Sequence, residues 1–522
     1  MKKTFSLFLF ALIYNSATAN NTADFNVMDF GTVADSSIVS TAKIQSAIDK
    51  CYQAGGGRVY FPPGEYKSGG LILKSNVRFH LESGATLIAS RDTNDYKKSQ
   101  NNSGDIIPVL LYAENAKNIS IEGLGTINGA ATHFKGELDM VDTFIGDITE
   151  NARKAGVSMT RFFHYKPYTC MIYFENCSFV TVRDITLTAS QFWTLHARWT
   201  DYLTIHGVKI FSDLEKGVNA DGIDIDGCRN VTISDCIVET ADDAIVLKTT
   251  ALHGESRSCE NVVVSNCVLQ SSSTAIKLGT ESHADFRYIS FNNCIIRNSN
   301  RGLSIVIRDG AIAENIQFSN IMIEGSRRHF NWWGNADPIW LVVLKRTPDS
   351  KIGQIRNVTF NNIIAHGMGT SKLEGFDGKP LENIQLNNVQ LFMYPENYID
   401  KRADDAFRAV NVKDLRLTDV SVNWYADKVE PLWHNAFTFK NVENLNLDKL
   451  TGTQAPTNSG VFIELNSVKN ALIQNCIPSA ATTIFVKVND GNNTGITLDR
   501  NFIFEKTKKM EFAKGVKKNS SK

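Results

Sequence analysis

Asp221, Asp242 and Asp243 are the residues of this 522-residue chain whose types and spacing best suit acid–base chemistry. Four segments align on one another, and their first residues follow at intervals of 22, 31 and 27 residues. They read Asp221-Gly-Ile-Asp-Ile, Asp243-Ala-Ile-Val-Leu, Thr274-Ala-Ile-Lys-Leu and Arg301-Gly-Leu-Ser-Ile. Stacked strands lie about 4.8 Å apart. We therefore expect Asp221 and Asp243 one above the other on one outer face, with Asp242 diverging from Asp243.

Two carboxylates at one strand spacing repel each other, and proteins tolerate this where the pair binds a metal, holds a water or shares a proton. A third carboxylate supplies what inverting glycoside hydrolysis needs, a base that activates water and a separate acid for the leaving oxygen. Solvated turn aspartates would explain an isolated Asp-Asp pair, but the stacking with Asp221 argues against that alternative. We expect no metal and no cofactor.

Side chains alternate along each aligned strand, so the residues that follow the aspartates divide between two faces. The residues expected to point inward are Ile223, Ile245, Ile276 and Leu303. Asp224, Lys277 and Lys248 are expected to point outward, near the carboxylates. Either ammonium would bind the carboxylate of a uronic acid, and simple charge compensation of the aspartates is the equal alternative.

A repeat must position these side chains. One unit recurs along the chain, for example Asn-Val-Thr-Ile-Ser-Asp-Cys from Asn230 and Asn-Val-Thr-Phe-Asn-Asn-Ile from Asn357. Its spacing is 23 to 31 residues with one interval of 42, and its last positions are Ile185, Val208, Cys236, Cys267, Cys294, Ile321, Ile363 and Val389. Weaker copies end at Leu124, Val420, Leu450 and Cys476. This period with strand-type alternation predicts an all-β solenoid of stacked strands, with ladders of Asn side chains at its turns.

The ends of the solenoid have their own signals. Residues 41–54 predict a capping helix, because Ile44, Ala47, Ile48 and Cys51 recur at helical spacing. We expect one β-helix catalytic domain over residues 20–505. Residues 506–522 carry seven lysines, which predicts a disordered, solvated tail.

Composition excludes several classes of partner. The formal net charge is zero, so there is no bulk electrostatic reason to expect nucleic acid. Residues 1–19 combine two lysines, an apolar run and Ala17-Thr18-Ala19, which predicts a secretory signal peptide. No later apolar run reaches the length of a membrane span. We expect an exported, periplasmic or extracellular monomer without membrane insertion.

Nine cysteines raise the question of disulfides in an exported protein. Several of them recur at one fixed place in the repeat, as Cys236, Cys267 and Cys294 do. That recurrence favours small, buried, mainly reduced side chains over bridges.

Asn219-Ala-Asp-Gly-Ile-Asp, Asp242-Asp243-Ala-Ile-Val-Leu-Lys and Phe25-Asn-Val-Met-Asp-Phe-Gly resemble segments of glycoside hydrolase family 28, the polygalacturonases. Phe192-Trp-Thr-Leu-His196 and Gly279-Thr-Glu-Ser resemble further segments of that family. The resemblance implies a right-handed, pectin-lyase-like parallel β-helix and an inverting mechanism on acidic pectic polysaccharide. It also implies that Asp242 protonates the glycosidic oxygen, while Asp221 and Asp243 hold the attacking water.

The chain departs from the family at two motifs. Ser272-Ser273-Thr274 stands where polygalacturonases carry Gly-His-Gly, and Ser304-Ile305-Val306 stands where they carry Arg-Ile-Lys. The missing cations normally hold galacturonate on the leaving-group side. Rhamnogalacturonan hydrolases of the family lack similar cations, so rhamnogalacturonan or another decorated pectin is favoured over plain homogalacturonan.

Other residues are candidates for substrate binding. Asn219 and Trp193 lie in resembling segments, and a rebuilt subsite would draw on Glu281, His283, Arg301 and Arg308. His283 is equally well explained as a surface loop residue. Trp332, Trp333 and Trp340 lie in or near the 42-residue coil and suit either sugar contact or loop packing. The insertion at residues 130–168 is expected to wall the groove, which would favour an exo mode.

Three alternatives stay open. A calcium-dependent, pectate-type lyase would use Asp221 and Asp243 for the metal and Arg301 as the base. An exo-polygalacturonase would release end units of homogalacturonan. A non-catalytic adhesin or tailspike-like binder would have no reason to keep three carboxylates in this arrangement.

Overall fold

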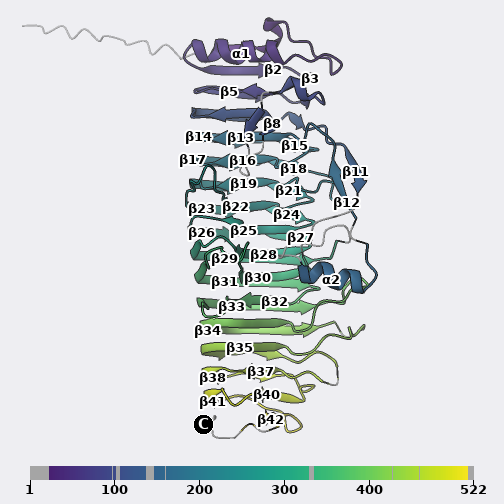
Figure 1. The fold of residues 1–522 in the computed structure, drawn as a ribbon, viewed down its shortest axis with the longest axis vertical. Helices are drawn as coiled ribbons and strands as arrows, with labels where there is room; N and C mark the ends of the chain where they lie inside the picture. The colour runs from purple at the N-terminus through teal and green to yellow at the C-terminus, as the bar shows by residue number, and fades with distance from the viewer. Residues whose placement is uncertain are drawn as a thin grey trace, which may run out of the picture.

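The computed structural model describes residues 23–514 and 516, apart from residues 97, 101–105, 137–145, 159, 329–333, 426 and 458. The chain winds into a long stack of coils, with the N-terminal helix at one end and the C-terminus at the other (Figure 1). The predicted signal peptide, residues 1–19, lies outside the described residues, as do Trp332 and Trp333.

Each coil contributes short strands that pair in parallel with the coils before and after it. The first row of strands carries the aligned segments from Asp221 to Arg301. It consists of β4 (Leu71–Ile72), β8 (Ile106–Glu114), β13 (Cys170–Glu175), β16 (Leu195–Arg198), β19 (Ile223–Asp226), β22 (Ile245–Thr249), β25 (Thr274–Ser282), β28 (Arg301–Ile307), β30 (Asp337–Val343), β32 (Ser371–Glu374), β37 (Ile463–Asn466), β40 (Ile484–Val488) and β42 (Lys508–Phe512).

The second row carries the Asn-rich units. It consists of β1 (Asp24–Asn26), β2 (Gly57–Phe61), β5 (Val77–Leu81), β9 (Lys117–Gly123), β14 (Ser178–Arg183), β17 (Asp201–His206), β20 (Arg229–Ser234), β23 (Cys259–Ser265), β26 (Phe286–Asn292), β38 (Lys469–Gln474) and β41 (Thr494–Asp499). The third row consists of β3 (Gly64–Ser68), β6 (Ala85–Ala89), β10 (Thr126–Asn128), β15 (Thr186–Thr188), β18 (Lys209–Phe211), β21 (Ile237–Thr240), β24 (Val268–Ser271), β27 (Ile295–Ser299), β36 (Thr451–Gly452) and β39 (Ile477–Pro478).

Five long strands run through more than one row and join the rows into a continuous sheet. These strands are β29 (Ile312–Gly325), β31 (Gln354–Gly367), β33 (Leu381–Met393), β34 (Phe407–Trp424) and β35 (Phe437–Asp448). The architecture is a parallel β-helix, which confirms the fold expected from the repeat.

The core is a column of inward side chains from successive coils. Ile223, Ile245, Ile276 and Leu303 are fully buried, as their alternation predicted. Phe318 stacks between Phe291 and Phe360, with ring centroids 5.1 Å and 5.0 Å away. Identical environments on neighbouring coils therefore place like side chains on one another, and this stacking continues the core along one axis.

Asn ladders form at the turns, as predicted. The side-chain amide of Asn261 donates to Asn230 at 3.2 Å, and that of Asn357 donates to Asn315 at 3.1 Å. These residues adopt positive φ values, such as 58° at Asn261, a left-handed conformation that Asn tolerates better than most residues. The ladder therefore satisfies a strained turn and links adjacent coils.

The last positions of the strong repeat units are all buried, as are those of three weaker copies. Leu124 is the exception, because it is 68% exposed. The predicted weak copy that ends at Leu124 is therefore wrong by register. Ile121 and Ile127 fill the core on that coil, and Leu124 lies in the turn between β9 and β10.

The nine cysteines are all free and buried, which confirms the prediction of packed thiols. The Cys236, Cys267 and Cys294 side chains each lie next to a backbone carbonyl of their own turn, at 3.2–3.3 Å. They fill the same core position that Ile or Val occupies on other coils.

The predicted capping helix is confirmed. Helix α1 (Thr41–Gln53) buries Ile44, Ala47, Ile48 and Cys51 against the first coil. A short 3-10 helix, η1 (Val27–Phe30), precedes α1 in the sequence, and a second, η2 (Thr93–Asp95), follows β6. The cap covers apolar groups that an open end of the stack would expose to water.

The lysine-rich C-terminal segment differs from the prediction of a disordered tail. Residues Lys508–Phe512 form β42, which pairs with β40 through Val486 and Met510. Lys508 and Glu511 are ion-paired at 2.9 Å. Because Met510 and Phe512 pack on the last coil, the segment closes the stack although its composition is polar.

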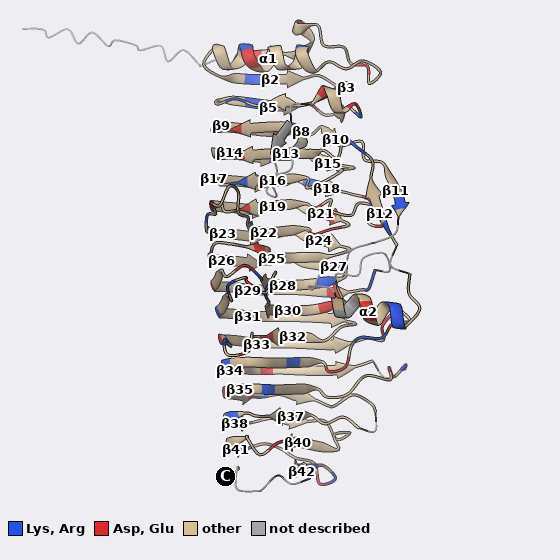
Figure 2. Cartoon of the chain, viewed as in Figure 1, with Lys and Arg blue, Asp and Glu red and all other residues tan. Residues whose placement is uncertain are grey.

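Oppositely charged residues also alternate along the second row. Each of the following residues is the cross-strand partner of the next: Asp201, Arg229, Glu260, Arg287, Glu314, Arg356, Glu382, Lys413, Glu443 and Lys469. Acidic and basic segments are spread along the length of the stack in Figure 2. We call this column the charge ladder. If a strand paired with the next coil but one instead of with its neighbour, like charges would face each other. The ladder therefore favours the observed strand pairing.

Two excursions leave the stack. The strands β11 (His133–Gly136) and β12 (Arg161–His164) form an antiparallel pair, and α2 (Gly146–Lys154) lies between them in sequence. Strand β7 (Lys98–Gln100) pairs antiparallel with β8. None of the helices among the described residues has the length and apolar character of a membrane span.

Candidate active site

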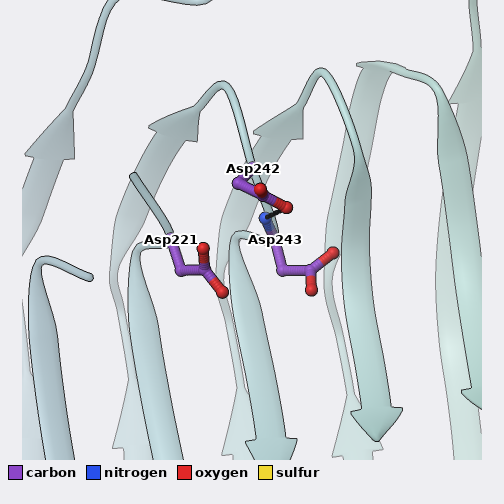
Figure 3. A group of neighbouring side chains, drawn as sticks. All are labelled: Asp221, Asp242 and Asp243. Carbon is purple, nitrogen blue, oxygen red and sulfur yellow. Dashed lines mark hydrogen bonds between the residues drawn. The ribbon is translucent and has the colours of Figure 1, made fainter. Parts of the chain in front are cut away.

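Asp221, Asp242 and Asp243 meet at the turns that lead into the first row. Asp221 lies just before β19, and Asp242 and Asp243 lie just before β22. In Figure 3 the side chains of Asp221 and Asp243 come from neighbouring coils and point the same way, with Asp242 above Asp243. One oxygen from each carboxylate lies within 4.8 Å of the other two, and all three residues are buried. The stacking inferred from the sequence is therefore what the structure shows.

Backbone contacts fix Asp242. Its two carboxylate oxygens accept the N–H groups of Asn219, at 3.1 Å, and Asp243, at 2.9 Å. Its backbone carbonyl accepts hydroxyl groups from Thr240, at 2.8 Å, and Ser271, at 2.7 Å. Both ends of this residue are held, so its carboxyl has one defined orientation.

Lys248 balances Asp221. Its ammonium lies 3.1 Å from Asp221 and 3.0 Å from Asp224, and its side chain is 5% exposed. The ring of Trp193 covers the same ammonium, with the Nζ atom 3.6 Å from the ring centroid. Although burial lowers it, the neighbouring carboxylates hold the pKa of Lys248 well above its ordinary value.

Asp243 has two partners from the following coil. The ammonium of Lys277 lies 2.6 Å from it, and the hydroxyl of Ser273 donates to it at 3.1 Å. Ser273 is the residue that stands in place of the expected histidine. The sequence marked this position only as a departure, and the structure shows it in direct contact with a carboxylate.

The two sides of the cluster differ in charge balance. Burial raises the pKa of Asp242 well above its ordinary value, and the charges of Asp221 and Asp243 raise it further. Burial also raises the pKa of Asp221, but Lys248 opposes this effect. Among the ion pairs of the described residues, none includes Asp242. Asp242 is therefore the carboxyl of the three best placed to keep a proton.

Glu281 lies at the rim of the cluster. It is 4.0 Å from the ammonium of Lys248 and 3.6 Å from the guanidinium of Arg346. Burial raises the pKa of Glu281, but Lys248 and Arg346 outweigh that effect and hold it at about 2. Glu281 is therefore anionic and repels a further anion from its side of the groove.

Three predicted residues lie beyond this first group of contacts. His283 is 3.7 Å from Asp309, which also binds Arg346, so it joins the cluster only through other ion pairs. Arg308 is buried, and its backbone N–H donates to Ser282 at 2.8 Å. Arg301 is buried beside Asp337 at 3.4 Å.

The three carboxylates are close enough together to suggest a cation site. Asp221 and Asp243, however, each already have a lysine ammonium within 3.1 Å. Two fixed positive charges at that distance oppose a divalent ion. The arrangement fits acid–base work better than metal binding.

Comparisons with known proteins bear on this geometry. The model for glycosyl hydrolases family 28 matches residues 159–404, and the model for rhamnogalacturonase A/epimerase, pectate lyase-like, matches residues 25–122. Residues 159–404, a little under half of the chain, therefore resemble glycosyl hydrolases family 28, in agreement with the resemblance seen in the sequence motifs. The matched range contains all three aspartates and both lysines.

The similar proteins are distant in sequence. A protein named "Probable polygalacturonase" from Vitis vinifera is 24% identical over 242 residues, 43% of this chain and 44% of its own length. The chain thus spans less than half of that relative. The exopolygalacturonase of Thermotoga maritima has a TM-score of 0.58 at 20% identity, covering 80% of this chain and 91% of its own. The family 28 exopolygalacturonase of Yersinia enterocolitica has a TM-score of 0.60 at 19% identity, covering 82% and 78%. The fold is the right-handed parallel β-helix of these structures.

The insertion at residues 130–168 supplies contacts that the sequence did not assign. Arg161 donates to the side chain of Asn219 at 3.2 Å, and that side chain donates to the hydroxyl of Tyr168 at 2.9 Å. The ring of His164 binds the carbonyl of Val218 at 2.6 Å. The insertion therefore sits on the loop before Asp221. In the sequence, the insertion was recognisable only as a gap between two repeat units, and nothing there indicated these contacts.

Val306, one of the positions that depart from the family motifs, has apolar neighbours. Val306 forms a small outer cluster with Trp340 and Val342, and Leu344 packs against it. Trp340 also lies over the guanidinium of Arg301, whose central carbon is 4.0 Å from the ring centroid. An apolar cluster therefore stands where the family motif has a lysine.

Proposed function

We propose that this protein is an inverting glycoside hydrolase that cleaves α-galacturonosyl linkages in pectic polysaccharide or its oligosaccharides. One observation carries the proposal. Asp221 and Asp243 each contact a lysine ammonium, whereas the pKa of the buried Asp242 is raised well above its ordinary value by burial. A buried carboxyl that favours its protonated form, next to two carboxyls that each contact a lysine ammonium, supplies an acid and a base in one site.

Asp242 is the general acid in this scheme. It gives its proton to the glycosidic oxygen as the bond to the anomeric carbon breaks. Asp221 and Asp243 accept the two hydrogens of one water, and one of the pair takes its proton as the water oxygen bonds to the anomeric carbon. Asn219 and Asp243 orient the acid through their backbone N–H groups, at 3.1 Å and 2.9 Å.

Stereochemistry rests on the family resemblance. The carboxylate oxygens lie within 4.8 Å of one another, closer than the roughly 6.5–9.5 Å that is usual between acid and base in inverting enzymes. A water held jointly by Asp221 and Asp243 lies beside the aspartates, not between acid and base, so a short spacing is compatible with inversion. Proton NMR of the first-formed product tests this, and net retention would contradict it.

A rhamnogalacturonan or another decorated pectin is the substrate that the groove favours. The apolar cluster of Val306, Trp340 and Val342 has no cation of its own, and the guanidinium of Arg301 beside it is already paired with Asp337. Desolvating a carboxylate against such a surface is unfavourable. Lys277, whose side chain is 12% exposed, is the better placed of the two lysines to contact one acidic sugar. A neutral sugar on the other side of the cut fits this asymmetry.

Cutting from a chain end is the mode that the insertion favours. Arg161, His164 and Tyr168 join the insertion to the loop before Asp221, at distances of 2.6–3.2 Å. A rigid wall this close to the acid restricts how far a polysaccharide can extend past the cut. An exo-acting polygalacturonase is the second candidate on this ground.

A panel of pectic fragments tests substrate and mode together. It comprises homogalacturonan, rhamnogalacturonan and decorated forms, with chromatographic analysis of products over time. We expect reducing ends to appear fastest from a rhamnose-containing or decorated fragment, as small products from the start. Fastest cleavage of unbranched homogalacturonan would contradict the subsite assignment. An ultraviolet-absorbing unsaturated product would identify a lyase instead.

A further inference from the structure

We propose that Lys248 is a positioning residue whose ammonium, held under the ring of Trp193, keeps Asp221 ionised as part of the water-holding base. This inference rests on the proposed function. It assigns Lys248 a role other than substrate binding, because its ammonium is already engaged with Asp221.

The surroundings of Lys248 leave it little freedom to reach a substrate. Its side chain is 5% exposed, and its ammonium has Asp221 at 3.1 Å and Asp224 at 3.0 Å. The ring of Trp193 lies 3.6 Å away on a third side, and Glu281 lies 4.0 Å away. A substrate carboxylate would have to displace one of these partners.

The Trp193 ring is itself held in place. It packs edge to face on His196, with centroids 4.8 Å apart and an interplanar angle of 89°. His196 contacts Asp226 at 3.3 Å and stacks on Tyr173 with centroids 4.6 Å apart. Asp226 accepts the backbone N–H of Thr250 at 2.8 Å. This chain of contacts fixes the aromatic face against which the ammonium lies, and a cation on an aromatic face gains stability where water is excluded.

Lys248 does not divide its charge equally between its two nearest carboxyls. Asp224 is fully buried, and burial raises the pKa of Asp224 well above its ordinary value, which favours its neutral form. A neutral Asp224 leaves the positive charge of Lys248 to Asp221. The ammonium then offsets the repulsion that Asp243 exerts on Asp221.

The other charged or titratable groups around Asp221 do not replace Lys248. Lys277 is engaged with Asp243 at 2.6 Å. Glu281 is an anion on the far side of Lys248, and Tyr168 is a neutral phenol bound to Asn219 at 2.9 Å. Removing the Lys248 ammonium therefore leaves Asp221 as a buried carboxylate beside the like charge of Asp243, a situation that favours protonation.

The test compares Lys248→Met, Lys248→Arg and the wild type. As the pH falls, kcat/KM decreases when the base of the free enzyme becomes protonated. We call this part of the pH profile the acid limb. We expect Lys248→Met to move that acid limb to higher pH by roughly one unit or more, the size of shift that an opposite charge at 4–6 Å produces. Lys248→Arg should return the limb toward the wild-type position, with KM little changed in both variants.

A matched control uses another ion-paired lysine of the first row, whose side chain is 13% exposed. Lys372 forms an ion pair with Asp337 at 3.3 Å, comparable to the pair of Lys248 with Asp221 at 3.1 Å. Lys372 lies on β32, where it is the cross-strand partner of Trp340. Lys372→Met should leave the acid limb where it is. A raised KM without a limb shift in Lys248→Met would show that Lys248 binds substrate. A uniform loss at every pH, with the limb unmoved, would show a structural role. Either result would overturn the proposal.

A second measurement needs no substrate. Infrared difference spectra of the folded proteins follow the ionisation of carboxyl groups with pH. In Lys248→Met we expect one carboxyl to ionise at higher pH than in the wild type, and the added substitution Asp221→Asn should remove that signal. An unchanged titration would overturn the role of Lys248. A wild type that cleaves no pectic fragment would overturn the proposed function and leave this titration decisive for Lys248.

Discussion

Asp242 and Asp243 have a counterpart on the same outer face of the stack. Ala403-Asp404-Asp405-Ala406 repeats Ala241-Asp242-Asp243-Ala244, and strand pairing places Phe407 five coils from Ile245 in the same register. The N–H of Asp405 donates to Asp404 at 2.8 Å, as that of Asp243 does to Asp242. Asp404, however, is paired with Arg408 at 2.7 Å. The same four-residue pattern thus has a different electrostatic environment on this coil, because Asp404 has a basic partner in Arg408.

The acid and base assignments predict the effect of removing each carboxyl. Asp242→Asn and Asp243→Asn should each lower kcat by about 10²–10⁴-fold, because a positioned acid or base contributes that much. Circular dichroism should show that both variants keep the fold. Asp405→Asn is the matched control and should keep near wild-type turnover, since five strand spacings place it roughly 24 Å away. Near wild-type activity in Asp242→Asn or Asp243→Asn would remove that residue from the mechanism.

Charge balance at the same residues predicts independence from metal ions. Lys248 and Lys277 already neutralise Asp221 and Asp243 at 3.1 Å and 2.6 Å. Activity on the best pectic fragment should therefore survive EDTA and should not rise when calcium is added. Loss with EDTA and rescue by calcium would move the protein to the calcium-dependent lyases.

Asp405 predicts a pH effect on stability that is separate from activity. Burial raises the pKa of Asp405 to about 6, helped by the charge of Asp404. A raised folded-state pKa means a stabilising neutral form that is present below pH ~4 and lost as pH rises through about 6. Asp405→Asn mimics the neutral form. Relative to the wild type, its free energy of unfolding should rise by about 3 kcal/mol at most between pH 4 and 7.5.

Urea unfolding of both proteins across that pH range measures this difference. Asp242→Asn is unsuitable as a reference, because the ionisation of Asp242 depends on that of Asp221 and Asp243. A difference between Asp405→Asn and wild type that stays constant with pH would mean that Asp405 keeps the same charge in the folded and unfolded states.

At the scale of elements, the insertion that contains β11, α2 and β12 decides what the groove accepts. Arg161 anchors it through Asn219, and Lys216 faces the ring of Phe162 at 5.7 Å. The hairpin has its own aromatic packing, with Phe134 and Phe163 centroids 5.7 Å apart. The hairpin therefore has packing of its own and contacts the stack through polar groups.

Loosening this docking should change the product pattern. Arg161→Met removes the guanidinium that binds Asn219, and we expect larger oligosaccharides among the early products because the groove end is less firmly closed. Lys154→Met is the control, since Lys154 on α2 is exposed and pairs with Glu150 of the same helix at 3.5 Å. Chromatography of early time points measures the pattern. Unchanged product sizes in Arg161→Met would argue against the insertion as the cause of exo cutting.

At the scale of the whole molecule, the charge ladder ties the coils together along the second row. Arg287 shows its geometry, with Glu260 at 3.2 Å and Glu314 at 3.2 Å on the neighbouring coils. Arg287 also pairs with Asp285 on its own coil. Exposed pairs of this kind contribute little one at a time. Several in one column act together on register.

Reversing one rung tests the ladder. Arg287→Glu would place a carboxylate among three others, and we expect it to destabilise the protein by about 1–2 kcal/mol, the sum of a few partly exposed pairs. Raising the salt concentration should recover part of the lost Tm, because screening weakens repulsion between exposed charges. Arg297→Glu at the edge of the third row, paired with Glu239, is the comparison. Equal salt-independent losses in both variants would argue against a role in register.

The sequence determined the features that depend on one coil and its neighbours. Strand alternation with a period of two fixed which side chains enter the core, and a nearly constant coil length placed Asp221 and Asp243 on each other. Ile223 and Ile245 confirm this, since both are buried as predicted and are direct cross-strand partners. Buried thiols and Asn ladders follow from the same local rule.

Tertiary structure decided what lies across those coils. The bond from Ser273 to Asp243, the docking of Arg161 on Asn219 and the burial of Lys248 under Trp193 were all absent from the sequence pattern. The insertion has no repeat register, so its place on the stack cannot be read from spacing. The environment of Lys248 depends on side chains from three coils at once, because a buried charge is set by every neighbour within a few ångströms and not by its own strand.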